Sequence, residues 1–125
     1  MEAGGSQRFR RTHRLRSSKD FRRVSREGVR VASRSFVLLL SAQREATGEG
    51  RARLGVTVSR RVGNAVVRAR VKRRIREWFR RNRERAPMQR DLVVIARPNA
   101  ASLAYAEIES ELAGVLRRVG KVGKP

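Results

Sequence analysis

The stretch from Gly63 to Arg85, GNAVVRARVKRRIREWFRRNRER, limits what this chain can fold into more than any other part of it. Its apolar residues recur at intervals of four, four, three and one: Val67, Val71, Ile75, Trp78 and Phe79. At 100° per residue they form a single stripe along a helix, whereas a strand would need strict alternation. The sequence therefore predicts one long helix that packs through this stripe against the rest of the protein.

The rest of this predicted helix surface is cationic. Its basic residues before the end of the helix are Arg68, Arg70, Lys72, Arg73, Arg74, Arg76, Arg80, Arg81 and Arg83. Like charges four residues apart, such as Arg68 and Lys72, destabilise an isolated helix by about 0.3 kcal/mol per pair. A bound polyanion would relieve this repulsion. We therefore interpret the helix as a surface for a charged partner.

The charge of the whole chain points to nucleic acid as that partner. Lys and Arg number 32 against 11 Asp and Glu, which gives a net charge of +21 and a pI of about 12.0. Such an imbalance favours nucleic acid first and an anionic membrane second. Arg outnumbers Lys, and its planar, forked donors suit phosphate oxygens. Because phosphate contacts carry little sequence information, we expect recognition of shape rather than of sequence.

Composition excludes several other classes of protein. The chain has no cysteine, which excludes disulfides and cysteine-ligated zinc. Its one histidine, His13, leaves little for a metal site or a catalytic triad, and no metal site is predicted. The carboxylates show no spacing typical of a catalytic pair or a metal site, which argues against catalysis by the polypeptide. No apolar run approaches the length of a membrane span, so we expect a cytoplasmic protein without a membrane partner.

The remaining elements follow from shorter patterns. We expect, in order, a helix capped by Ser17 or Ser18 and ending near Glu27, an extended piece at 29–32, strands at 34–43 and 52–59, the long helix, a strand at 91–97, and a helix from Ser102 to about 119. This αββαβα order, with room for one extra short strand, predicts a two-layer α+β domain with a small mixed sheet and about three helices.

The chain length suits one domain. We expect a flexible basic arm at 1–14, a single RNA-binding domain at 15–119 and a frayed tail at 120–125. The turn before the long helix has both a structural and a functional interpretation. Gly63 allows an unusual backbone and Asn64 is a good N-cap, while a helix N-terminus beside Arg60 and Arg61 is also suited to a phosphate.

From Ser59 to Arg76, SRRVGNAVVRARVKRRIR, the sequence strongly resembles the protein subunit of bacterial ribonuclease P. That family carries a GNAV-type turn followed by Arg-Asn-Arg, then Lys-Arg and a further Arg. Here the motif is Arg68–Ala69–Arg70, followed by Lys72, Arg73 and Arg76, with Ala69 in place of the family's Asn. The resemblance extends over about 14–118 through the patterns DF..V...G, R.FVL and DLVVIARP.

The resemblance implies a left-handed crossover through the motif helix and a role in an endoribonuclease. In this family the protein joins a catalytic RNA that, with Mg²⁺, removes the 5′ leader of precursor tRNA. The RNA supplies the catalytic groups, and no obligate protein partner is expected. The predicted contacts with the RNA subunit are Arg60, Arg61, Asn64, Arg68, Arg70, Lys72, Arg73 and Arg76.

A cleft between the first helix and the sheet receives the leader in this family. The resemblance places Phe21 and Phe36 in that cleft, and strand alternation adds Arg53 and Thr57. The alternatives are a ribosomal protein or general RNA chaperone, which would share the charge but not need the GNAVVR turn, and an independent metal-dependent nuclease, which the scattered acids disfavour.

Overall fold

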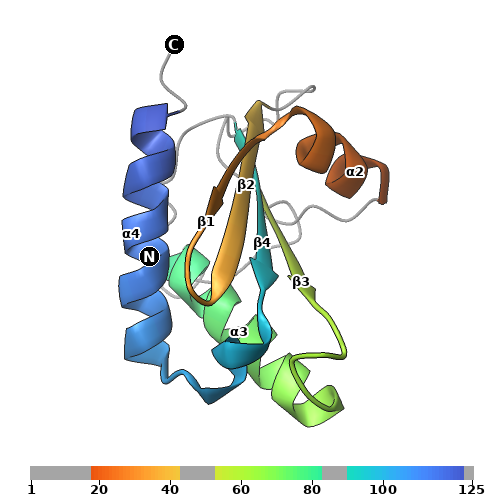
Figure 1. Ribbon diagram of the computed structural model, residues 1–125, viewed down its shortest axis with the longest axis vertical. Helices are drawn as coiled ribbons and strands as arrows, with labels where there is room; N and C mark the ends of the chain where they lie inside the picture. The colour runs from red at the N-terminus through yellow and green to blue at the C-terminus, as the bar shows by residue number, and fades with distance from the viewer. Residues whose placement is uncertain (1–17, 43–52, 83–89, 123–125) are drawn as a thin grey trace, which may run out of the picture.

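The computed structural model describes residues 18–42, 53–82 and 90–122 (Figure 1). Along the chain its elements are α2 (Ser18–Glu27), β1 (Val29–Ala32), β2 (Phe36–Ala42), β3 (Arg53–Val58), α3 (Ala65–Asn82), β4 (Arg90–Ala96), the 3₁₀ helix η3 (Pro98–Ser102) and α4 (Tyr105–Val122). The arm expected at 1–14 lies outside the described residues. The extra short strand allowed for in the sequence is β1.

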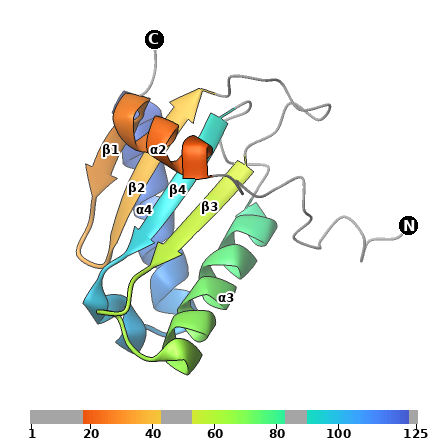
Figure 2. The same cartoon turned by 90° about the vertical axis from the view of Figure 1, so that its right-hand side faces the viewer.

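The strands form one mixed sheet in the order β1-β2-β4-β3. β1 pairs with β2 and β2 with β4 in antiparallel fashion, whereas β3 runs parallel to β4. Within the described residues, the predicted α+β class, with a small mixed sheet and about three helices, is confirmed. In Figure 2 α2 lies in front of the sheet and β3 and β4 run downward, with β4 to the left of β3 and α3 behind. The β3–α3–β4 crossover is therefore left-handed, the rare hand for parallel strands.

Helices cover both faces of the sheet (Figure 1). The apolar clusters buried on the two faces differ in size. α3 and α4 cover one face and bury the larger cluster, which includes Trp78, Phe79, Ile75, Leu92 and Ile108. Among the residues described, the opposite face carries only α2, whose Val24 packs against Val37, Leu39 and Val93. Burying each large side chain contributes about 1.5–3 kcal/mol, so the α3 and α4 side holds the main core.

The apolar stripe of α3 faces this core as the sequence predicts. Val71, Ile75, Trp78 and Phe79 are buried. The Oδ1 atom of Asn64 accepts a hydrogen bond from the backbone N–H of Val67 at 3.0 Å, which confirms the predicted N-cap. A Cβ on Gly63 would lie 2.8 Å from Val67 Cγ1, so the tight entry into the helix requires glycine.

The segment after β4 differs from the prediction. Ser102 does not cap the last helix, because its Oγ donates to the carbonyl of Asn99 at 3.1 Å within η3. α4 begins at Tyr105 instead, where Glu107 Oε1 accepts the backbone N–H of Ala104 at 2.8 Å. The helix continues to Val122 rather than ending near 119, and so includes the first part of the segment expected to fray.

Candidate nucleic-acid interface

One flank of α3 is turned toward η3 and the start of α4. Arg70 Nη2 donates to the carbonyl of Ala101 at 3.2 Å, and Arg74 Nη1 donates to that of Leu103 at 2.7 Å. Both guanidinium groups therefore help to hold α3 against the following segment. Arg70, predicted to contact RNA, has an intramolecular role that the sequence did not reveal.

The other basic residues between Arg68 and Arg76 lie on the outer side of α3 and on the flank opposite Arg70 and Arg74. Arg68, Lys72 and Arg76 follow at steps of four, which places them in one row along the helix. Arg73 is exposed, and so are Arg60, Arg61 and Asn64 at the turn before the helix. We call the following residues the α3 cationic surface: Arg60, Arg61, Arg68, Lys72, Arg73 and Arg76.

The acid of α3 lies away from the first turns of this surface. Glu77 is the only carboxylate in Ala65–Asn82, and it forms ion pairs with Arg80 and Arg81 near the helix end. A hydrogen bond from Arg80, followed by the charges of Arg80 and Arg81, lowers the pKa of Glu77 against the opposing effect of burial. Because Glu77 is engaged there, the first turns of α3 have no acid of their own helix beside them.

A groove runs between α2 and the sheet, on the face away from α3. It has a volume of about 560 Å³ and is lined by Phe21, Arg22, Ser25, Arg26, Thr57, Val93 and Ile95. The ring of Phe21 lies directly on the backbone of Gly55, where a Cβ would approach Phe21 Cζ to 2.6 Å. The groove thus combines an apolar floor with a hydroxyl and cationic rim, a composition that suits a base and its phosphate.

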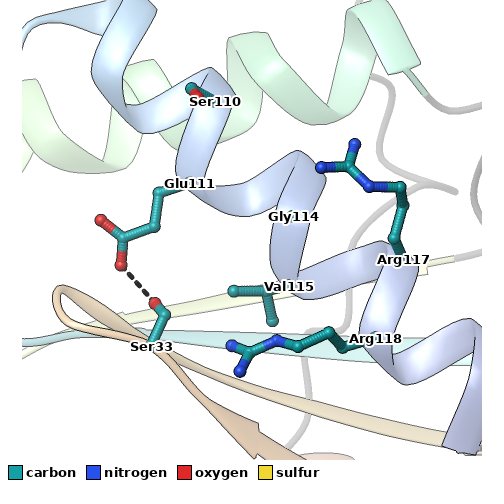
Figure 3. A pocket seen from close by; sticks show the side chains of 7 residues that line it. All are labelled: Ser33, Ser110, Glu111, Gly114, Val115, Arg117 and Arg118. Carbon is teal, nitrogen blue, oxygen red and sulfur yellow. Dashed lines mark hydrogen bonds between the residues drawn. The ribbon is translucent and has the colours of Figure 1, made fainter.

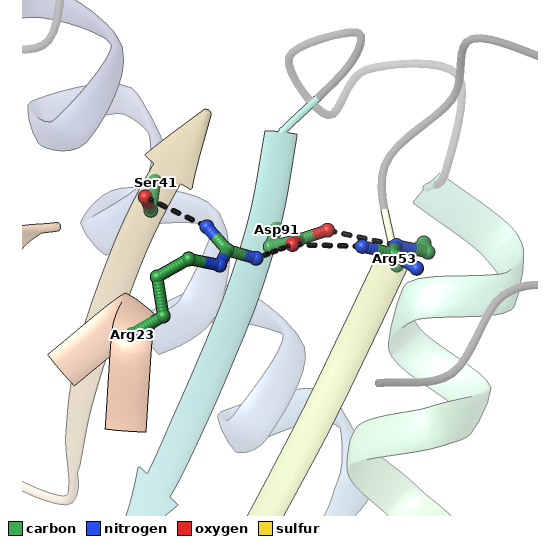
Figure 4. A network of polar contacts seen from close by, with 4 residues as sticks. All are labelled: Arg23, Ser41, Arg53 and Asp91. Atoms are coloured by element: carbon green, nitrogen blue, oxygen red, sulfur yellow. Dashed lines mark hydrogen bonds and ion pairs between the residues drawn. The ribbon is translucent and has the colours of Figure 1, made fainter. Parts of the chain in front are cut away.

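Beside this groove, a polar network is buried between α2 and the sheet (Figure 4). Asp91 on β4 is fully buried and accepts a bidentate pair of hydrogen bonds from Arg53 on β3, from Nε at 2.9 Å and from Nη2 at 3.0 Å. Arg23 on α2 also donates to Asp91, and its Nη1 reaches Ser41 Oγ on β2 at 3.4 Å. One carboxylate therefore joins α2 to the two strands on which the groove lies.

The structure brings together only part of the predicted leader cleft. Phe21 and Thr57 line the groove. Arg53 lies on the same sheet face, with its guanidinium held by Asp91. The placement of Phe36 in the cleft is wrong: the side chain is fully buried among the residues that α3 and α4 cover. Alternation along β2 turns Val37 toward α2 and therefore Phe36 away from it.

Sequence reasoning missed Arg22, Arg26 and the buried ion pairs. The alternation of Asp91 with Val93 and Ile95 could have placed that carboxylate on the groove face. Which arginines pair with Asp91 depends on the strand order and on where α2 packs on the sheet. No pattern within a single element of the sequence indicates either.

A second hollow, of about 460 Å³, lies on the other side of the molecule between α4 and the β1–β2 hairpin (Figure 3). Glu111 accepts hydrogen bonds there from Ser33 Oγ and from the backbone N–H of Ser35, the latter at 2.7 Å. Arg118 donates to the carbonyl of Ala32 at 2.9 Å. These contacts fasten the hairpin to α4, and the hollow contains none of the predicted site residues.

Across 18–42, 53–82 and 90–122, no three or more His, Asp or Glu side chains gather where they could hold a metal ion. None of the helices described is both long and apolar enough to cross a membrane.

Comparison with known proteins identifies the family. A sequence model of the family Ribonuclease P matches residues 9–120. The ribonuclease P protein component of Syntrophobacter fumaroxidans is 43% identical over 94% of this chain and 98% of its own length. That of Brevibacillus brevis is 43% identical over 86% of this chain and 83% of its own.

Solved structures agree. A Staphylococcus aureus RNase P protein mutant with defective mRNA degradation activity superposes with a TM-score of 0.82 at 31% identity, covering 96% of this chain and 98% of that one. The RNase P protein of Thermotoga maritima gives a TM-score of 0.74 at 32% identity, covering 84% and 96%. The chain belongs to the ribonuclease P protein family.

Proposed function

We propose that this chain is the protein component of a ribonuclease P ribonucleoprotein that matures the 5′ end of precursor tRNA. The single observation that carries the proposal is the α3 cationic surface, a row of guanidinium and ammonium groups on a helix whose apolar stripe is anchored in the core. A rigid cationic row of this kind is suited to a folded polyanion. Membership of the ribonuclease P family supports the RNA subunit as that polyanion.

Binding to the RNA subunit would act mainly through phosphates. Each phosphate neutralised by an Arg or Lys releases condensed counterions, so the affinity falls as salt rises. The row of Arg68, Lys72 and Arg76 would follow one strand of the RNA, with Arg60 and Arg61 extending the contact beyond the helix N-terminus. The hydrogen bonds of Arg70 and Arg74 to backbone carbonyls would hold α3 in place while the helix binds the RNA.

The α2 groove would hold the 5′ leader. The Phe21 ring can pack against a base, and Thr57 lies exposed on the neighbouring strand. Arg22 and Arg26, exposed on α2, would contact leader phosphates. Since stacking and phosphate contacts accept any base, we expect the groove to bind leaders of varied sequence.

The catalytic groups would come from the RNA, with Mg²⁺ held by RNA phosphates. Three of the described carboxylates are engaged within the protein: Asp91 with two arginines, Glu77 with two more, and Glu111 with the β1–β2 hairpin. The protein would extend the surface that contacts the substrate and would screen the repulsion between the phosphates of the two RNAs. Both effects lower the Mg²⁺ concentration that cleavage requires.

Reconstitution tests this function directly. The protein is mixed with its cognate RNA subunit and a precursor tRNA, and 5′ cleavage is measured across a Mg²⁺ titration. We expect cleavage at low Mg²⁺ only with the protein present, and no cleavage by the protein alone. An unrelated basic protein of equal charge serves as the control for the chaperone alternative. Equal cleavage with and without the protein at every Mg²⁺ concentration, or equal rescue by the control protein, would contradict the proposal.

A further inference from the structure

The network of Arg23, Asp91, Arg53 and Ser41 is the most deeply buried polar cluster that the described residues place beside the groove (Figure 4). The Asp91 side chain is 0% exposed and that of Arg23 7%, whereas that of Arg53 remains 21% exposed. A buried carboxylate without partners is strongly disfavoured, so the two guanidinium groups are needed for its charge to be kept inside.

We propose that Asp91 is a positioning residue for the leader groove: it fixes α2 on the sheet and thereby sets where Phe21, Arg22 and Arg26 meet the leader. The proposal rests on the function of the groove proposed above. Asp91 itself is fully buried, so it would act on the leader through α2 rather than by touching it. Arg53, which strand alternation suggested as a leader contact, acts with it by bracing the carboxylate from β3.

The way α2 is seated explains why one carboxylate has this effect. The apolar contacts of α2 come from Val24 and Phe21, against a cluster much smaller than that beneath α3. Arg23 lies between these two residues in sequence and ties the same segment to Asp91 on β4. Phe21 packs on Gly55, which is paired with Val93 on β4, two residues beyond Asp91. A change at Asp91 is therefore transmitted to the Phe21 ring through one helical turn.

Electrostatics and positioning predict opposite results for Asp91→Asn. Removing a negative charge beside a polyanion site raises the local positive potential and by itself favours leader binding. Loss of the fixed α2 position disfavours it. If Asp91 acts by positioning, the substitution weakens leader binding even though the net charge of the protein becomes more positive.

The experiment uses the reconstituted holoenzyme and precursor tRNAs with a long leader or a leader of one nucleotide. The leader contribution is the ratio of the two Kd values, and cleavage gives KM and kcat for each substrate. For Asp91→Asn we expect the leader contribution to fall about tenfold, with the change in KM rather than in kcat. Affinity for the RNA subunit through the α3 cationic surface should be unchanged.

A direct structural readout separates positioning from a general loss of stability. Because the Phe21 ring lies on Gly55, its ring current acts on the Gly55 amide. The NMR chemical shift of that amide therefore reports the position of α2 on the sheet. We expect Asp91→Asn to move this shift while the amides of α4 stay in place. Glu111→Gln, an equivalent change in the contact between α4 and the β1–β2 hairpin, is the matched control and should leave the leader contribution intact.

Arg53→Gln provides the second variant, because Arg53 is partly exposed and Arg23 continues to pair with Asp91 in its absence. It should lower the leader contribution in the same direction and combine less than additively with Asp91→Asn. Unchanged or tighter leader binding by Asp91→Asn overturns the inference. If Asp91→Asn does not fold, the same result for Arg53→Gln overturns it. If the wild-type protein itself shows no leader contribution, the proposed groove function fails instead.

Discussion

At the scale of single residues, the direction in which an arginine side chain points decides whether it can contact RNA or stabilises the fold. Helix α3 is rich in arginine, yet Arg70 and Arg74 donate to backbone carbonyls of the following segment. Lys72 lies in the row on the opposite flank of the helix, and Arg73 is exposed on its outer side. The charge of a residue alone therefore does not identify it as an RNA contact.

Replacing Lys72 and Arg73 together by alanine should weaken binding to the RNA subunit. It should also reduce the slope of log affinity against log salt by up to about two, since each phosphate contact contributes about 0.9. Titrations at several salt concentrations measure this slope. Arg34→Ala with Arg117→Ala removes the same charge from exposed positions away from α3 and should leave the slope nearly unchanged. Equal slopes for the two double variants would contradict the assignment of the α3 cationic surface.

Glu77 gives a pH-dependent prediction. Its pKa is lowered in the folded protein, mainly by the hydrogen bond from Arg80, so its contribution to stability is present above the ordinary value of 4.5 and is lost as pH falls through the folded value. Because the side chain is about one-third exposed, Glu77→Gln should cost no more than about 0.5 kcal/mol at neutral pH. Urea unfolding of both proteins should show this difference near neutrality and a smaller one in acid. A difference that grows in acid would be inconsistent with the ion pairs.

At the scale of elements, α3 and α2 are attached to the sheet in different ways. α3 is held by a continuous apolar stripe, whereas α2 relies on Val24, Phe21 and the contact of Arg23 with Asp91. The proposed RNA-subunit surface thus lies on a firmly docked helix, and the proposed leader groove lies beside a lightly docked one. Perturbations of the α2 side should affect leader binding first.

Gly55→Ala tests this separation. The added Cβ would lie 2.6 Å from Phe21 Cζ, so the ring must move and the groove change shape. We expect leader-dependent affinity to fall while affinity for the RNA subunit is retained, as measured by Kd for substrates with and without a leader. Gly114→Ala is the control, because its Cβ would meet only Arg117 Nη2 at 3.7 Å. Normal leader binding by Gly55→Ala would show that the groove does not depend on the position of Phe21.

At the scale of the whole molecule, the sheet separates the larger core from the face that carries the proposed leader groove. The two aromatic residues first assigned to one cleft lie on opposite sides of that sheet. Phe36 belongs to the core beneath α3 and α4, and Phe21 belongs to the groove. Phe36 should therefore matter mainly for stability, and Phe21 mainly for binding of the leader.

Phe36→Ala should destabilise the fold by about 3–5 kcal/mol, the usual cost of truncating a fully buried phenylalanine. Phe21→Ala should cost less, because its ring is only half-buried, but should remove most of the leader contribution. Urea unfolding gives the stabilities and substrate Kd values give the leader contribution. Equal destabilisation by the two substitutions would argue against this division of the sheet faces.

The sequence by itself determined the features that depend on neighbours along the chain. The stripe of α3, its Asn64 cap and the alternation of β3 are local patterns, and each was read correctly because periodicity reflects burial within one element. Resemblance to the family predicted the left-handed crossover, which the structure confirms, and the class of partner proposed for this chain.

Only the tertiary structure decided which side chains meet. The face to which Phe36 turns depends on the register of β2 with β4, and the partners of Asp91 depend on strand order and on where α2 is seated. Arg70 and Arg74 found carbonyl acceptors only because η3 follows β4 and passes beside α3. Periodicity within an element gives the direction of a side chain relative to that element, and contacts between elements arise only when their packing is fixed.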